Sequence, residues 1–156
     1  MKSKYSIAED KNIDREILLK LSDKDFVVAC NSSRYLRDTV CDENFFKRRL
    51  SLTYPDTLNF KSDHENWKQY YLSTIFYIAK MKEKHGYSYT FGNPKTQYKI
   101  IENLIDTNAN TLLFKSAVTG ELSLVIEAVK RGANVRAGLD YSLREASYKG
   151  HLEVIK

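Results

Sequence analysis

The chain has 156 residues, 42% of them hydrophobic and 29% charged, which excludes an intrinsically disordered protein and suits one ordinary domain or two small ones. The formal net charge is +5, but the basic residues are spread along the chain and the densest cluster, Lys47-Arg48-Arg49, lacks the longer stripe typical of nucleic-acid footprints. No run of about 18 apolar residues is present, so the sequence predicts neither a membrane span nor a signal peptide.

Residues 1–55 form the first segment, in which we expect three or four short helices. One helical face is predicted from four aliphatic residues spaced three and four apart: Ile13, Ile17, Leu18 and Leu21. Ser22, followed by Asp25 three residues later, is a variant of the capping box and begins a helix that contains Phe26. Asp42 is the predicted cap of the last helix in this segment.

The order of aliphatic, acidic and aromatic residues in this segment follows a known pattern. Residues 17–21 are mostly leucine, residues 23–26 lead from aspartate to phenylalanine, and residues 44–49 combine two phenylalanines with three basic residues. This order resembles a degenerate F-box, and the resemblance implies docking on a Skp-type adaptor of a cullin ubiquitin ligase. The candidate docking residues are Ile13, Ile17, Leu18, Leu21 and Phe26. The alternative is a small helical cap without a ligase role, in which the same residues form a core.

Two cysteines lie in this first segment. Cys30 and Cys41 have no neighbouring histidine, and the chain contains no further cysteine. Because a structural zinc site needs four closely spaced ligands, the sequence predicts no metal site here. Without a secretory signal, we expect both thiols to be reduced and buried, as in proteins of a reducing compartment.

Residues 56–109 form a connecting segment of further helices. Ser62 and Glu65 match the pattern Ser-x-x-Glu, which predicts that a long helix begins at Ser62. The apolar face of this helix, which contains Trp67, is wide enough for burial on two sides. Core packing explains this face best, and a peptide-binding groove is the alternative. Asn93-Pro94 then begins another helix, with proline at its first position.

A pattern with a period of 30 residues occupies the end of the chain. Gly120 and Gly150 align with one another, and a pair of small residues precedes each, Ser116-Ala117 and Ala146-Ser147. The small pairs allow two short helices to approach closely, and each glycine provides the positive φ that the turn between them needs. The helix after Gly120 is predicted to end at residues 130–132, where two cations lie near its carbonyl end.

This pattern closely resembles the ankyrin repeat, because residues 132–137 and 150–155 correspond to two consensus segments of that family. The resemblance implies about one and a half repeats over residues 110–156, as the start of an α-solenoid. The period is shorter than the ~33 residues usual in the family, which implies a shortened β-turn finger between Ala137 and Ser142. Short repeats of this kind look like ankyrin proteins of large DNA viruses that infect amoebae. Because a stack normally needs about three repeats, we expect a fragment of a longer repeat protein or a stack capped by the preceding helices.

The sequence therefore predicts an all-α protein with an F-box-like segment, central helices and C-terminal ankyrin repeats. The predicted function is a protein–protein interaction scaffold, which becomes a substrate adaptor of a Skp–cullin ubiquitin ligase if the F-box-like segment docks. The expected contacts to a target protein are Lys115, Val118, Thr119, Arg136, Asp140, Arg144 and Tyr148. One alternative is a scaffold with no ligase link. A nucleic-acid-binding protein is a further alternative, which requires the scattered charges to converge.

Patterns typical of catalysis are missing from the sequence. The three histidines lie far apart, and neither a nucleophile elbow nor a glycine-rich phosphate loop is present. We therefore expect no enzymatic activity, no cofactor and no metal ion. The expected location is the cytoplasm, and the host-cell cytoplasm if the chain is viral.

Overall fold

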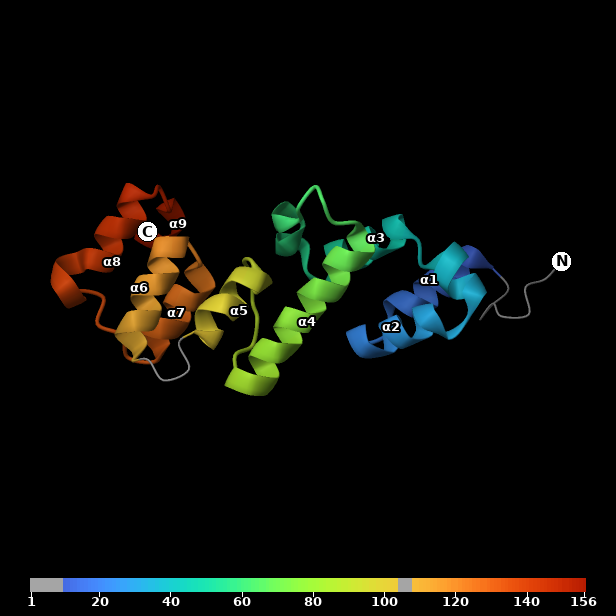
Figure 1. Ribbon diagram of the computed structural model, residues 1–156, viewed down its shortest axis with the longest axis horizontal. Helices are drawn as coiled ribbons and strands as arrows, with labels where there is room; N and C mark the ends of the chain where they lie inside the picture. Colours follow the sequence, from blue (N-terminus) through green and yellow to red (C-terminus); the bar gives the residue numbers. More distant parts are fainter. Residues whose placement is uncertain (1–9, 104–107) are drawn as a thin grey trace. The chain divides into compact units, whose positions relative to one another are not determined.

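The computed structural model describes residues 10–103 and 108–156 (Figure 1). Every regular element in these two ranges is a helix, which confirms the predicted all-α class. The chain divides into two compact units, Met1–Ile75 and Phe76–Lys156, and the boundary falls inside one long helix. No helix in the described part of the chain combines the length and the apolar character that a membrane crossing requires.

The first unit is built from short helices. They are α1 (Lys11–Leu19), α2 (Asp23–Ser32), the π-helical turn η1 (Leu36–Val40), α3 (Glu43–Thr53), the 3-10 turn η2 (Pro55–Phe60) and the first half of α4 (Trp67–His85). Asp10, Ser22 and Asp42 cap α1, α2 and α3 by accepting hydrogen bonds from backbone amides of the first turns. The caps predicted at Ser22 and Asp42 are thus confirmed, and each satisfies amides that the helix itself leaves unbonded.

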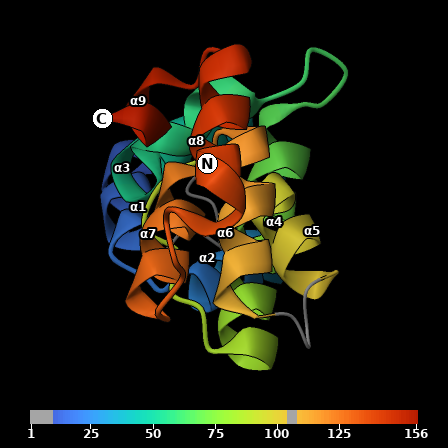
Figure 2. The ribbon, with the colours of Figure 1, turned by 90° about the vertical axis from the view of Figure 1, so that its left-hand side faces the viewer.

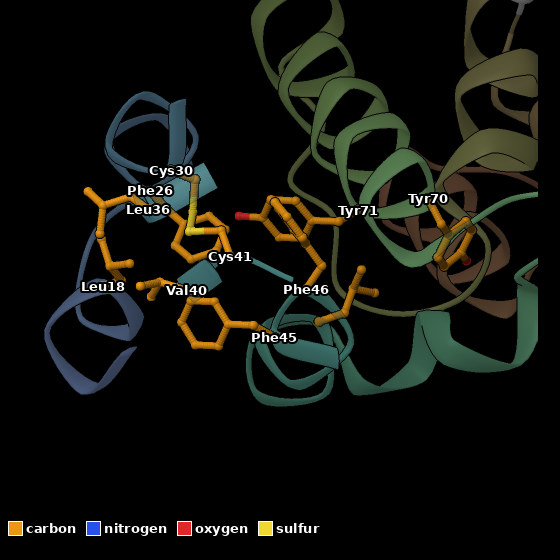
Figure 3. Packing of buried hydrophobic residues seen from close by; sticks show 11 residues of the cluster. Leu18, Phe26, Cys30, Leu36, Val40, Cys41, Phe45, Phe46, Tyr70 and Tyr71 are labelled. Atoms are coloured by element: carbon orange, nitrogen blue, oxygen red, sulfur yellow. A yellow bond between two sulfur atoms is a disulfide. The ribbon is translucent and has the colours of Figure 1, made fainter. Parts of the chain in front are cut away.

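Aromatic rings fill the core of the first unit. The ring of Phe26 contacts those of Phe45, Phe46 and Tyr71, at centroid distances between 5.4 and 5.7 Å (Figure 3). All four side chains are buried, and Leu18 from α1 joins the same cluster. Because aromatic rings bury the largest apolar areas, this cluster contributes most of the hydrophobic stabilisation of the unit.

A buried arginine connects α1, α2 and α3. The guanidinium of Arg49 donates hydrogen bonds to the carbonyl oxygens of Leu19 at 2.6 Å and Leu21 at 2.7 Å. It also donates to the carboxylate of Asp23 at 3.1 Å, and Asp23 in turn accepts from the hydroxyl of Tyr71 at 2.8 Å. Burial, and then the Asp23 carboxylate, raise the pKa of Tyr71 above its usual range. Arg49 is therefore a core residue, although the sequence places it in the basic cluster at residues 47–49.

The two cysteines form a disulfide (Figure 3). Cys30 lies near the end of α2 and Cys41 directly follows η1, so that their Cα atoms are 5.8 Å apart. Both residues are buried, as predicted. The prediction that their thiols are reduced is wrong, because η1 turns the chain back and brings Cys41 against Cys30. The disulfide also removes the sequence argument for a reducing compartment.

The long helix α4 begins at Trp67 and not at Ser62 as predicted. The side chain of Asn66 accepts a hydrogen bond from the amide of Gln69 at 2.8 Å, and the side chain of Gln69 accepts one from the amide of Asn66 at 3.2 Å. Glu43 of α3 accepts a further bond from the amide of Trp67 at 2.6 Å. This reciprocal capping box, with its tertiary partner, outcompetes the Ser-x-x-Glu match at Ser62.

The second unit contains helices that fold back on one another. They are the second half of α4, α5 (Pro94–Glu102), α6 (Ala109–Thr119), α7 (Leu122–Lys130), α8 (Ala137–Tyr148) and α9 (Leu152–Ile155). α7 lies alongside α6, and α8 packs on α6 as well (Figures 1 and 2). Asn93 caps α5 and Pro94 occupies its first turn, as predicted.

Each turn between paired helices contains a glycine in the left-handed conformation. Gly120, between α6 and α7, has a φ of +76°, and Gly150, between α8 and α9, has a φ of +75°. The turn roles predicted for both glycines are confirmed. The ring of His151 donates a hydrogen bond to the carbonyl of Val118 at 3.1 Å and lies so close that a Cβ on Gly120 would be 2.6 Å from its Nδ1 atom. Gly120 is therefore required for its backbone conformation and for the approach of His151.

The connection between α7 and α8 differs from the prediction. A shortened β-turn finger was expected over residues 137–142, but these residues form the beginning of α8. The first turn of α8 is irregular, because Gly138 and Asp140 both have positive φ values, +65° and +59°. The turn of the connection lies before α8, where the amide of Asn134 donates to the side chain of Asn110 at 2.7 Å. This bond from α6 holds the turn that precedes α8.

Candidate partner-binding surface

The residues predicted to contact a target protein lie on α6, on the turn before α8 and on α8 itself. Six of them are exposed: Lys115, Thr119, Arg136, Asp140, Arg144 and Tyr148. Tyr148 is the extreme case, with 88% of its surface accessible. Val118 is half-buried, and its carbonyl oxygen is occupied by His151. Most of this set is therefore available to a partner.

Two of the predicted residues line one groove between α5 and α6. The groove measures about 450 Å³ and is lined by Thr96, Lys99, Ile100, Asn103, Lys115 and Thr119. The contribution of α5 was not foreseen from the sequence. Its signal is the spacing of Lys99 and Asn103, which are four residues apart and so share one helical face near the end of α5.

The groove has two cationic side chains. Lys99 and Lys115 are both exposed, and neither forms an ion pair with a carboxylate within residues 10–103 and 108–156. The hydroxyl of Thr119 donates to the carbonyl of Lys115 at 3.0 Å and so retains only acceptor capacity toward the groove. Donors from Lys99, Lys115 and the Asn103 amide therefore dominate the polar groups of the groove, which favours an acceptor-rich or anionic occupant.

The four predicted residues of the α8 side are not among those that line this groove. Arg136 immediately precedes α8, Asp140 lies in its irregular first turn, and Arg144 and Tyr148 follow along the helix. One contact between this helix and α6 is aromatic, in which the rings of Phe114 and Tyr141 stack with centroids 5.1 Å apart. The sequence gives no signal for this contact, because it depends on how one helix pair is placed on the other.

The predicted adaptor-docking residues of the first unit divide into two groups. Ile13 and Ile17 are exposed on α1, at 51% and 37% of their surfaces. Leu18 and Phe26 are completely buried, as the alternative role of these residues in a helical core expects. They face the aromatic core and cannot contact a partner unless the unit opens. Leu21 is partly buried and packs against the same core.

Comparisons with known proteins leave the family open. No family model matches the sequence, and neither a curated protein nor a solved structure is matched. Within the described residues, no group of three or more His, Cys, Asp and Glu side chains is arranged to hold a metal ion. The resemblances to ankyrin repeats and to an F-box therefore depend on the residues named above.

Proposed function

We propose that this chain is a protein–protein interaction scaffold of the ankyrin type, which binds a target protein through its second unit. The observation that carries the proposal is the exposed surface of α5, α6 and α8, which contains the groove with Lys115 and Thr119. The left-handed glycines at positions 120 and 150, each between two helices, further support the repeat type. A stack of this kind presents a rigid surface, so that a partner can bind without a cost for ordering loops.

The test is affinity capture from a lysate of the source cells, followed by direct binding measurements with each captured protein. The comparison is between the natural chain, a Lys115→Glu/Arg144→Glu variant, and a Lys130→Glu variant that changes an exposed lysine of α7. We expect at least one protein to bind the natural chain and the Lys130→Glu chain, and to lose affinity for the double variant. If the double variant binds every captured protein as tightly as the natural chain, the proposed surface is wrong.

A role as a ubiquitin-ligase adaptor is the second candidate, and the observation that favours it is the exposure of two aliphatic residues on α1. Ile13 and Ile17 are four residues apart and lie next to each other on one helical face. The test is a pull-down with a Skp-type adaptor at micromolar concentration. The ligase role requires a complex that Ile13→Asp/Ile17→Asp abolishes and that Val28→Asp, at an exposed valine of α2, leaves intact. Without any complex, the scaffold alone remains.

A further inference from the structure

We propose that the groove between α5 and α6 binds a short acidic peptide segment of the target, with one aliphatic side chain in contact with Ile100 and carboxylates at Lys99 and Lys115. This inference rests on the proposed scaffold function and adds the chemistry of the partner. The groove volume of about 450 Å³ lies within the range of known ligand pockets, roughly 300–1,000 Å³. It suits a few side chains of an extended segment better than a whole folded domain.

The floor of the groove supplies the apolar part of this recognition. Ile100 lines the groove and also packs against the buried clusters of the second unit that contain Leu112 and Leu124. Its position is therefore fixed by the core. The methylene stems of Lys99 and Lys115 can extend this apolar area while their ammonium groups stay in water. An aliphatic side chain of the partner would lose water-exposed area on such a floor.

The edge of the groove supplies the charge. None of the six described lining residues carries a carboxylate, so the two ammonium groups give this lining a positive charge. A second hollow of the same unit, beside α7, has a different character. It is lined by both Lys130 and Glu127, so its lining carries charges of both signs. Of these two hollows, the α5–α6 groove has the lining that is complementary to an acidic segment.

The lining also favours peptide over nucleic acid. Proteins that bind single strands provide aromatic rings on which bases stack, and none of the lining residues is aromatic. Two cationic side chains are sufficient to pair with the carboxylates of a short peptide. A phosphate backbone is usually bound by a longer row of cationic side chains. An acidic peptide with one aliphatic residue satisfies both the charge and the floor.

The experiment measures fluorescence anisotropy of a labelled peptide of about eight residues, with one central leucine flanked by aspartates and glutamates. Two further peptides isolate the contributions, one with the leucine changed to serine and one with the acids changed to their amides. A DNA oligonucleotide of equal charge is the fourth probe. We expect the full acidic peptide to bind best, and its affinity to fall as salt rises from about 50 to 300 mM, where the Debye length shortens.

Variants of the chain locate the binding. Lys99→Glu and Lys115→Glu should each weaken binding of the full peptide about 5- to 10-fold, since each exposed ion pair contributes modestly and reversal adds repulsion. Lys130→Glu, which makes the same change of charge on α7, should leave the affinity within about twofold. Melting curves of all three variants check that their second units remain folded.

Three outcomes would overturn the inference: equal weakening by Lys130→Glu, no loss of affinity on changing leucine to serine, or equally tight, groove-dependent binding of the oligonucleotide. A different result would test the scaffold proposal independently of the acidic-peptide groove. A captured target that is insensitive to Lys99→Glu and Lys115→Glu, but is lost with Arg144→Glu, would remove the acidic-peptide groove and retain the scaffold.

Discussion

At the scale of single residues, the contact of His151 with Gly120 joins the second helix pair to the first. The imidazole lies over the turn between α6 and α7 and is held by the carbonyl of Val118. Glycine is common in left-handed turns because of its positive φ. At position 120 it is also needed because a side chain from the next turn packs against it. These two requirements can be separated by experiment.

We predict that Gly120→Ala destabilises the second unit more than Gly132→Ala does. Both glycines have positive φ, +76° and +88°, so alanine costs about 1–2 kcal/mol at either position. Only at Gly120 would the new Cβ also collide with His151, whereas at Gly132 it meets open space. Urea denaturation followed by far-UV circular dichroism measures the difference. Equal losses at the two positions would show that the His151 contact does not matter.

Residue roles that are encoded locally were predictable, and those that depend on distant parts of the chain were not. The caps at Ser22 and Asp42 and the turn at Gly120 follow from nearby sequence alone. The burial of Arg49 depends on carbonyl groups of another helix, and the disulfide of Cys41 depends on the turn made by η1. Neither has a signature within a few residues.

At the scale of the elements, the beginning of α4 depends on a capping box that the sequence offers twice. Ser62 with Glu65 and Asn66 with Gln69 both match the spacing, and the structure uses the second pair. The deciding partner is Glu43 of α3, which accepts hydrogen bonds from the first amides of the helix. A local pattern therefore indicated that a helix begins here, whereas tertiary contacts selected the residue.

We predict that Asn66→Ala lowers the free energy of unfolding of the first unit by about 1 kcal/mol, the usual value of an N-cap. Ser62→Ala should change it by less than about 0.5 kcal/mol, because Ser62 lies outside the helix. The chain's single tryptophan, Trp67, stands at the first position of α4 and reports unfolding of this unit by fluorescence. A larger loss for Ser62→Ala would mean that α4 begins earlier in solution.

A buried carboxyl group connects α5 to the α6–α7 hairpin. Glu121 accepts a hydrogen bond from the side chain of Gln97 at 2.9 Å and lies against the amide of Asn93 at 3.4 Å. Burial raises the pKa of Glu121 above its ordinary value of 4.5, because the charged form is poorly solvated there. Among the described residues, the buried side-chain oxygen of Gln97 has no hydrogen-bond partner. An amide at position 121 could satisfy that oxygen.

We predict that Glu121→Gln stabilises the second unit at about pH 8 and that the gain disappears below about pH 4.5. A raised folded-state pKa means that the contribution of Glu121 to stability is fully present below the unfolded pKa of 4.5 and is lost as the pH rises through the folded pKa. Glutamine removes this loss because it has no charge to bury. Thermal melts across this pH range measure the effect, with Glu153→Gln as the exposed control. A Glu121→Gln chain that is less stable at every pH would contradict it.

At the scale of the whole molecule, two compact units differ in what stabilises them. The first has an aromatic core, a buried arginine and a disulfide, whereas the second depends on helix pairs joined at glycine turns. The all-α class and the glycine turns were predictable, because helical periodicity and glycine spacing are properties of the sequence itself. The division inside α4 was not, since a continuous helix gives no linker signal.

We predict that reduction of the disulfide destabilises the first unit and leaves the second unchanged. In the chain-entropy account, a loop of this size stabilises by about 2–3 kcal/mol. Hydrogen exchange measured by mass spectrometry should show faster exchange in peptides from residues 10–60 after reduction, and no change in peptides from residues 108–156. A Cys30→Ala/Cys41→Ala chain, which cannot respond to reductant, is the control. Loss of protection in both regions would contradict independent stabilisation.

The contact between His151 and Gly120 also restricts how this sequence can diverge. A bulkier residue at position 120 requires a smaller residue at position 151. In the same way, the ring at position 151 is tolerated only while position 120 has no side chain. We therefore expect substitutions at the two sites to be coupled, although each site belongs to a different helical hairpin. The residues allowed at one position in one hairpin thus depend on the residue already present in the other hairpin.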